Sequence, residues 1–313
     1  MVGKTALDAG GADHYETRKE RTSLENLFAE TKIIQNRFER SVSLLCWAYN
    51  EERSIEEYLR RALKLLEATI AEYEIVFIDD GSTDRTYEIA KSVQEKNPQL
   101  KIFRNERNLN VGISSRRAIQ RASKDFLFWQ TIDWCYNIED LRCFLEYLKL
   151  YDIVQGVRRR PVKVKIRLLK PFATVLKLFG IKHLTKRSDT VSKAIISVIN
   201  YSLIRMLFRV PLSDFQNVTF YPTRWIQSIR LESKSSFANP EGLIKSYWAG
   251  LSIREVPISF IPRCEGTARG TRSRAIMNSV YDIFRLWFKW IILRERGSVK
   301  KGKIVRLQPG ESD

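Results

Sequence analysis

The chain has 313 residues, of which 44% are apolar and 29% are charged, with only 14 Gly and 9 Pro. This composition excludes a disordered chain and predicts a globular protein with a sizeable core. Lys and Arg number 54 against 36 Asp and Glu, a formal net charge of +18, so the surface favours an anionic partner such as nucleic acid, a membrane face or a phosphorylated substrate.

The cysteines and the apolar segments bear on the cellular compartment. Cys46, Cys135, Cys143 and Cys264 show no CxxC spacing and no nearby His, which favours the reducing cytoplasm over a disulfide framework or a zinc site. We see no signal peptide, and no window holds the roughly 20 uncharged apolar residues of a spanning helix. We expect a cytoplasmic protein that is peripheral on the inner face of the cell membrane.

Strands and helices alternate after a polar extension that covers residues 1–40. We expect strands at 41–47, 74–78, 101–103, 126–131 and 152–155. We expect helices at 54–71, 84–95 and 112–122, and a fourth from 137 or 138 to about 150; a capping box of Ser54 and Glu57 opens the first of them. This order predicts an α/β fold with a mainly parallel twisted sheet, helices on both faces, and ligands at the carboxyl ends of the strands.

The second half is more basic. Between residues 157 and 210, fourteen Lys and Arg stand against a single acid, Asp189. We expect basic amphipathic helices at 166–181 and 194–208, followed by strands at 218–221 and 253–260. Such helices bind anionic membrane surfaces without spanning them, although each one alone also fits a solvated helix face.

A helix at 278–293 follows the main domain, which we place at 41–274, and a basic polar tail covers 297–313. Within the C-terminal amphipathic segment 275–296, apolar residues share one side and charged residues another. The apolar set is Val280, Ile283, Phe284, Trp287 and Ile291, and the polar set is Asp282, Arg285 and Lys289. This pattern fits a helix lying among lipid headgroups, or one that packs on the main domain.

Two polar motifs follow the first two predicted strands: CWAYNEE at 46–52 and DDGSTD at 79–84. Adjacent carboxylates before Gly-Ser make a tight turn whose oxygens can accept hydrogen bonds from a base N–H or from ribose hydroxyls. The alternative is that Ser82 and Asp84 only cap the next helix. We expect Asp79 and Asp133 to lie at adjacent strand ends and to face one cleft.

The motifs at 47–51 (WAYNE), 79–84, 110–112 (NVG) and 131–133 (TID) resemble, in order and separation, glycosyltransferase family two. Within it, the chain is most similar to polyprenyl-phosphate sugar transferases of the dolichol-phosphate mannose synthase type. The resemblance covers 41–274. It implies the GT-A fold and inverting transfer of a hexosyl group from a nucleotide-sugar.

The resemblance also implies roles for residues on the donor side. Those bordering the nucleotide-sugar are Ala48, Tyr49, Glu51, Asp79, Asp80, Gly112 and Asp133, with Arg263 and Arg269 at the diphosphate. Asp133 would ligate a divalent cation, Mg²⁺ or Mn²⁺, that bridges the diphosphate. Trp47 replaces the usual Pro, and Thr131 replaces the first Asp of D-x-D. Asp133 would therefore hold the metal alone with the diphosphate, or metal binding is lost and the enzyme has degenerated.

On the acceptor side, Asp214 and Glu241 occupy the positions of two family acids, and one of them would be the catalytic base or the carboxylate that orients the acceptor. Arg158, in the segment Gly-Val-Arg, and Arg187 would hold an acceptor lipid phosphate. The acceptor would be a polyprenyl phosphate or a growing surface glycan.

Net charge alone suggests a nucleic-acid-binding protein, but the chain has no RNP motif, zinc-finger spacing or basic zipper. We therefore expect no nucleic acid among its partners. A non-catalytic glycosyltransferase-like scaffold is the other alternative, because of Thr131.

Overall fold

The computed structural model describes residues 37–134, 138, 141–158, 191–215, 218–258, 273–296 and 302–306. The strands are β1 (Val42–Ala48), β2 (Tyr73–Asp79), β3 (Leu100–Arg104), β4 (Phe126–Trp129), β5 (Ile153–Arg158), β6 (Thr219–Pro222), β7 (Ile253–Ile258) and β8 (Ile304–Val305). The helices are α2 (Ile55–Thr69), α3 (Thr86–Gln94), α4 (Val111–Arg121), α5 (Leu141–Tyr147), α7 (Val191–Phe208), α8 (Thr223–Ser228), α9 (Ala238–Trp248) and α10 (Ser273–Trp287), which the π-helical turn η3 (Phe288–Ile292) continues. The elements predicted before residue 158 are confirmed, with ends shifted by a few residues.

The described strands form one eight-stranded sheet in the order β3-β2-β1-β4-β6-β5-β7-β8. β6 runs antiparallel to β4 and β5, and the other neighbouring pairs are parallel. This confirms the predicted α/β fold with a mainly parallel sheet. The chain runs outward from β1 to β3 and returns to β4 on the other side of β1. The point where strand order reverses, at which such sheets bind ligands, therefore lies between β1 and β4.

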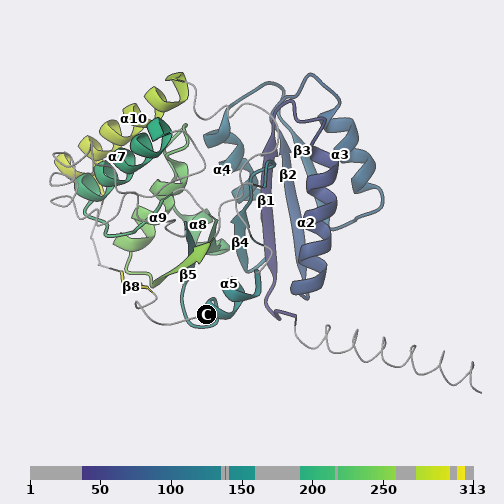
Figure 1. Ribbon diagram of the computed structural model, residues 1–313, viewed down its shortest axis with the longest axis horizontal. Helices are drawn as coiled ribbons and strands as arrows, with labels where there is room; N and C mark the ends of the chain where they lie inside the picture. Colours follow the sequence, from purple (N-terminus) through teal and green to yellow (C-terminus); the bar gives the residue numbers. More distant parts are fainter. Residues whose placement is uncertain are drawn as a thin grey trace, which may run out of the picture.

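Both faces of the sheet are buried because successive side chains of each strand point to opposite faces. In β1, Leu44 and Cys46 pack with residues of α2 and α3, whereas Leu45 between them packs with residues of α4, α7, α8, α9 and α10. Figure 1 shows these two helical layers on the two sides of the sheet. The sheet is thereby held rigidly, with its strand ends free to carry polar loops.

The predicted capping box at α2 is wrong, although the helix is present. Ser54 has helical backbone angles and makes no side-chain cap; its hydroxyl donates instead to Glu51 Oε2 at 3.2 Å. The first turn carries Glu56 and Glu57, whose negative charge suits the helix N-terminus. The negative charges of Glu56 and Glu57 near the helix dipole therefore stabilise the start of α2 in place of the expected side-chain cap.

The described residues test several of the predictions for the second half of the chain. α7 confirms the helix expected at 194–208, and the helix expected at 166–181 lies outside the described residues. The strands expected at 218–221 and 253–260 are present as β6 and β7, with β5 between them. Ile304 and Val305, in the predicted tail, form β8 beside β7.

The helix predicted at 278–293 is present and packs on the main domain through part of the predicted apolar set, with Ile283 in the core and Trp287 and Ile291 partly buried against it. Ile283, Leu286 and Trp290 are buried in the core between α10 and the sheet, whereas Phe284 is exposed. Asp282, expected with Arg285 and Lys289 on another side of the helix, is buried too. The face that turns inward therefore combines apolar side chains with Asp282, whose carboxylate is met by polar groups of the domain. Apolar side chains are also exposed on the outer side, so α10 is apolar on two sides.

Candidate functional site

Ala48 and Asp79 lie side by side where β1 and β2 end, as their register places them opposite each other. The Asp80 amide donates to the Ala48 carbonyl oxygen at 2.7 Å. Asp133 follows the end of β4, the neighbour of β1 on the other side. Asp79 and Asp133 thus both lie at carboxyl ends around the switch point, but β1 stands between their strands, so these strand ends are not adjacent as predicted.

Asp79 is fully buried and held by two groups. Its Oδ2 lies 3.0 Å from Arg104 Nε, and its Oδ1 accepts a hydrogen bond from the Ser82 amide at 3.3 Å. Burial raises the pKa of Asp79, although Ser82 and Arg104 act in the opposite direction. Because Asp79 is fully buried beside Arg104, a base or ribose would reach its carboxylate only after the side chains around it move. The sequence motif does not reveal Arg104, which lies 25 residues along at the end of the neighbouring strand β3.

Asp80 holds the next loop in place. Its Oδ1 accepts hydrogen bonds from Asn105 Nδ2 (2.7 Å), the Leu109 amide (2.9 Å) and Ser114 Oγ (2.8 Å). Arg117 donates in turn to Asn105 Oδ1. Asp80 is buried, and these contacts fix residues 105–114 beside Asp79. Asn105 and Ser114 carry no motif signal, so sequence reasoning missed them.

The two polar motifs are joined to each other by side-chain to backbone hydrogen bonds. Asn50 adopts a left-handed conformation with φ of 54°, and its amide donates to Ser82 Oγ at 2.9 Å. The Thr83 amide donates to Asn50 Oδ1 at 2.8 Å, and the Glu51 amide donates to Thr86 Oγ1 at 2.8 Å. Tyr49 and Glu51 are half-buried beside this junction. The motifs therefore form one preorganised unit at the ends of β1 and β2.

Neither Ser82 nor Asp84 caps α3, whose N-cap position is Arg85, but Asp84 binds the first residue of that helix. Its Oδ1 accepts hydrogen bonds from the amide (3.0 Å) and hydroxyl (2.5 Å) of Thr86 where α3 begins. Burial opposes the charge of Asp84, but the hydrogen bonds from Thr86 outweigh it and lower its pKa. Asp84 therefore stabilises the start of α3, whereas Asp79 lies at the end of β2.

Gly112 is buried at the start of α4, against the backbone of Lys234. A Cβ at this position would lie 2.6 Å from the Lys234 carbonyl oxygen. Asn110, two residues earlier, has φ of 70°. Because Gly112 has no side chain, the loop at 232–235 can pack directly against the N-terminal end of α4, which is the end that Asp80 holds through Ser114.

Gly112→Ala should therefore displace the loop at Lys234 and lower the free energy of unfolding by about 2 kcal/mol, as overpacking does. Gly242→Ala is the matched control, because its Cβ would meet only the side chains of Tyr221 and Ile226, at 3.2 and 3.3 Å. Urea unfolding of both variants checks this. Equal stability of the Gly112 variant and the wild-type protein would show that the loop yields freely.

Asp282 of α10 binds the other side of this loop. Its Oδ2 accepts hydrogen bonds from Ser233 Oγ (2.8 Å), Ser235 Oγ (2.7 Å) and the amides of Lys234 (3.1 Å) and Ser235 (3.2 Å). Arg285 donates to Oδ1 at 3.0 Å. Burial opposes the charge of Asp282, but the hydrogen bonds from Ser235, Ser233 and Arg285 outweigh it, so the pKa of Asp282 is lowered.

A lowered pKa in the folded state means that Asp282 stabilises the fold above its unfolded pKa of about 4 and loses this contribution as the pH falls through its folded pKa. We expect Asp282→Asn to be less stable than the wild-type protein at pH 7. The difference should shrink below about pH 4. Chemical denaturation at a series of pH values measures it. A difference that stays constant down to pH 2 would contradict this role.

Glu241, one of the two predicted catalytic acids, also holds the loop. It is fully buried; its Oε1 accepts a hydrogen bond from the Glu232 amide (2.8 Å) and lies 2.7 Å from Lys245 Nζ, and its Oε2 accepts one from the Ser233 amide (2.7 Å). With both oxygens bound to the chain, its geometry favours a positioning role over proton transfer.

Asp214, the other predicted acid, is buried between α7 and β6. Its Oδ1 accepts a hydrogen bond from the Phe215 amide (2.8 Å), and its main-chain oxygen accepts one from Gln155 Nε2 (2.5 Å). Ser213 donates through its amide to Glu255 Oε1 at 2.6 Å. β5 and β7 thus position this acid. Arg158 is the last residue of β5, while Arg187, Arg263 and Arg269 lie outside the described residues.

Asp133 lies in the turn after β4, where the Trp134 amide donates to the Thr131 carbonyl oxygen at 3.0 Å. Asp133 is half-buried and Thr131 is exposed. Among the described residues there is no group of three or more His, Cys, Asp or Glu side chains that could hold a metal. One carboxylate beside a hydroxyl fits a hard divalent cation only when a diphosphate and water supply its other oxygen ligands.

Comparison with known proteins adds to this geometry. The family model described as "Glycosyl transferase family 2" matches residues 43–208. The glycosyltransferase AglD of Haloferax volcanii is 24% identical over 255 residues, which cover 79% of this chain and 37% of that protein. The dolichol-phosphate mannosyltransferase of Pyrococcus furiosus is 31% identical over 118 residues, covering 37% of this chain and 33% of that protein. The matched part of the chain thus spans about a third of these relatives' length.

The fold is also shared with solved structures. A mannosyltransferase from Pyrobaculum calidifontis, in complex with GDP-Man and Mn²⁺, superposes with a TM-score of 0.52 at 14% identity, covering 83% of this chain and 70% of that one. The sheet and its flanking helices are therefore those of the GT-A fold, as predicted.

Proposed function

This chain belongs to glycosyl transferase family 2, and we propose that it transfers a hexosyl group from a nucleotide-sugar donor to an acceptor carried on a membrane. The observation that carries the proposal is the preorganised unit of strand-end loops around Asp79, with Asp133 on the other side of β1. Rigid polar groups at the switch point of a parallel sheet suit a nucleotide. Relatives named as glycosyltransferases support the same class of reaction.

On the donor side, Asp79 would accept hydrogen bonds from the base or ribose once Arg104 moves, with Ala48, Tyr49 and Glu51 around them. Asp80 and Gly112 would act by fixing the loops on which this pocket depends. Asp133 would hold a divalent cation together with the donor diphosphate. When bound, that cation would supply the positive charge that stabilises the leaving diphosphate. Arg263 and Arg269 remain proposed as diphosphate contacts.

On the acceptor side, an oxygen of the acceptor would attack the anomeric carbon as the bond to the diphosphate breaks, which inverts the configuration. A polyprenyl phosphate is already ionised at neutral pH, so it needs orientation more than proton removal. We assign this orientation to Asp214, with Arg158 and Arg187 at the lipid phosphate. Glu241 would position the loop at 232–235.

The location proposed for the reaction is the inner face of the cell membrane. Where the structure describes the chain, no helix is both long enough and apolar enough to cross a bilayer. A chain with net charge +18 is attracted to anionic lipids. A peripheral enzyme would thus meet a cytoplasmic nucleotide-sugar and a lipid-borne acceptor at one surface.

The test is a transfer assay with the full chain, labelled UDP- and GDP-sugars, Mn²⁺ or Mg²⁺, and a polyprenyl phosphate in detergent. We expect label from one donor in the organic phase. Transfer only to added glycan would establish the glycan acceptor instead. No transfer and no hydrolysis with any donor would leave the non-catalytic scaffold as the better account.

A further inference from the structure

Helix α10 carries a second apolar stripe, on the side that faces away from the core. Its members, spaced three or four residues apart, are Met277, Tyr281, Phe284, Phe288 and Ile292. Each of these side chains is between 46% and 66% exposed. The spacing places them along one line of the helix and its π-helical turn. A continuous row of large exposed apolar side chains on a protein surface marks a binding face.

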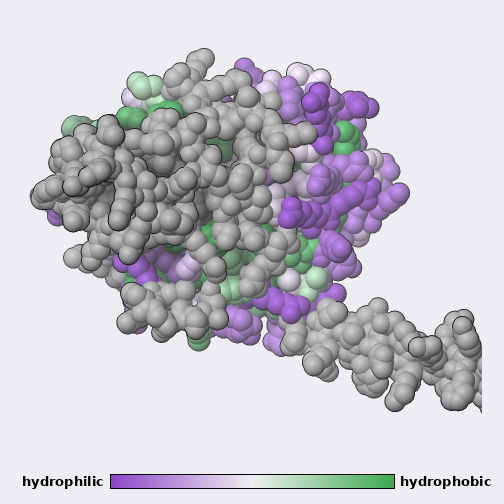
Figure 2. Space-filling model, in the orientation of Figure 1, coloured by the Kyte–Doolittle hydropathy of each residue, from purple (hydrophilic) through white to green (hydrophobic). Residues whose placement is uncertain are grey.

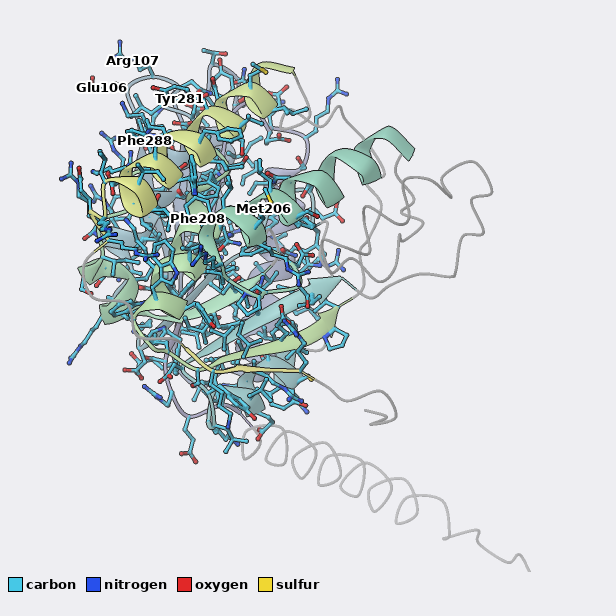
Figure 3. The ribbon with its side chains drawn as sticks, turned by 90° about the vertical axis from the view of Figure 1, so that its left-hand side faces the viewer. Glu106, Arg107, Met206, Phe208, Tyr281 and Phe288 are labelled. Atoms are coloured by element: carbon cyan, nitrogen blue, oxygen red, sulfur yellow. The ribbon has the colours of Figure 1, made fainter. Side chains whose placement is uncertain are left out.

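α7 packs beside α10 and also carries an exposed apolar side chain. Met206 of α7 is exposed, although Phe208, two residues on, is fully buried. Figure 3 shows Tyr281 and Phe288 along α10 and Met206 on the neighbouring helix. Figure 2 shows apolar colour at the upper left edge, where Figure 1 places α10, while hydrophilic colour dominates the opposite flank with α2 and α3.

The charges around the stripe favour an anionic partner. Arg285 and Lys289 are paired with Asp282 and Glu232 on the inner side of α10, so the cations beside the stripe are those at its end. Arg294 and Arg296 are exposed and directly follow the stripe, and Arg209, at the end of α7, is exposed too. Two copies of a +18 chain that met through this face would repel each other, whereas an anionic bilayer would attract it.

We propose that this stripe is the face that enters the headgroup layer of an anionic membrane. The aromatic and aliphatic side chains would lie at the boundary of headgroups and acyl chains, with the arginines among the lipid phosphates. The choice of partner rests on the membrane-borne acceptor proposed above. The residues of this stripe are largely different from the apolar set that the sequence predicted for the helix, which included the buried Ile283.

The inner side of α10 connects this face to the site. Asp282 binds the loop at 233–235, and Lys289 and Trp290 contact Glu232 at 2.5 and 3.1 Å. That loop closes on Gly112 at the start of α4. A membrane-bound α10 would therefore hold the strand-end loops at a fixed orientation to the lipid surface.

The test compares Phe288→Glu with Leu150→Glu, which adds the same charge at another exposed apolar side chain, beyond α5. The full chain is sedimented with vesicles of phosphatidylcholine containing phosphatidylglycerol, and with vesicles of phosphatidylcholine alone. We expect the wild-type protein and Leu150→Glu to bind the anionic vesicles, more weakly at high salt. Phe288→Glu should bind about tenfold or more weakly, with an unchanged melting temperature.

Three results would overturn the proposal. The first is equal vesicle binding by Phe288→Glu and the wild-type protein; the second is a lower melting temperature of Phe288→Glu, which would mean that the chain itself covers the stripe. The third is that the wild-type protein does not bind vesicles but self-associates, and that Phe288→Glu abolishes this self-association. Transfer to a short-chain, water-soluble polyprenyl phosphate separates this proposal from the enzymatic one. Phe288→Glu should keep that activity. If no variant transfers sugar but vesicle binding follows the stripe, only the proposed reaction fails.

Discussion

Asp133→Asn should lower sugar transfer by about a thousandfold while the melting temperature stays within about 2 °C of wild type. The carboxylate is the proposed protein ligand of the cation that stabilises the leaving diphosphate, a contribution of several kcal/mol, and about 4 kcal/mol corresponds to a thousandfold. Both carboxylate oxygens are enclosed, but Asn has nearly the same shape as Asp, so the substitution should affect the transition state more than the fold. Steady-state rates at saturating Mn²⁺, with thermal melts, measure both.

Thr131→Asp is the matched variant, because it restores a second carboxylate beside Asp133 on the same turn. It should lower the Mn²⁺ concentration needed for half-maximal rate, since a hard cation gains an oxygen ligand. Wild-type activity in Asp133→Asn at all Mn²⁺ concentrations would contradict the assignment of Asp133.

Asp80→Ala should destabilise the protein by about 3 kcal/mol and lower its melting temperature by roughly 5 °C. The substitution removes the acceptor of three hydrogen bonds and leaves the buried donors of Asn105 and Ser114, and the partly buried amide of Leu109, without this partner. Donor affinity should fall as well, because the loop beside Asp79 loses its support. Differential scanning calorimetry and nucleotide titration measure the two effects.

Asp80→Asn separates the acceptor from the charge. The amide oxygen can still accept at the place of Oδ1, so this variant should lose less than half as much stability as Asp80→Ala. A double-mutant cycle with Asn105→Ala should show coupling, since the two side chains are in direct contact at 2.7 Å. Additive losses, or a wild-type melting temperature for Asp80→Ala, would contradict the role of Asp80 as the support of the loop.

The order of strands and helices up to β5 was predictable because local patterns carry it. Short apolar runs such as the one around Leu44 and Leu45 alternate with amphipathic helices and end in polar loops. The motif at 79–84 also marked the right strand end. Which of its side chains face a ligand was not predictable, because Asp80, Ser82 and Asp84 are committed to partners 25 to 34 residues away or to the next helix.

The orientation of α10 could not be predicted from its own spacing. Ile283 and Phe284 are neighbours with similar hydropathy, and only tertiary partners decide which of them is buried. Ser233 and Ser235 meet Asp282 and so fix the rotation of the helix. The same long-range dependence applies to Glu241, whose motif position suggested chemistry but whose oxygens bind the backbone at Glu232 and Ser233.

Binding of a nucleotide-sugar tests the central claim most directly, because every proposed role depends on a donor held at the ends of β1, β2 and β4. The measurement is the melting temperature of the full chain with a panel of UDP- and GDP-sugars, with and without Mn²⁺, since a ligand that binds only the folded state raises it. We expect one nucleotide-sugar to raise the melting temperature in a Mn²⁺-dependent manner, and this shift to disappear in Asp133→Asn. No shift with any donor at millimolar concentration, in a protein that melts cooperatively, would contradict the account.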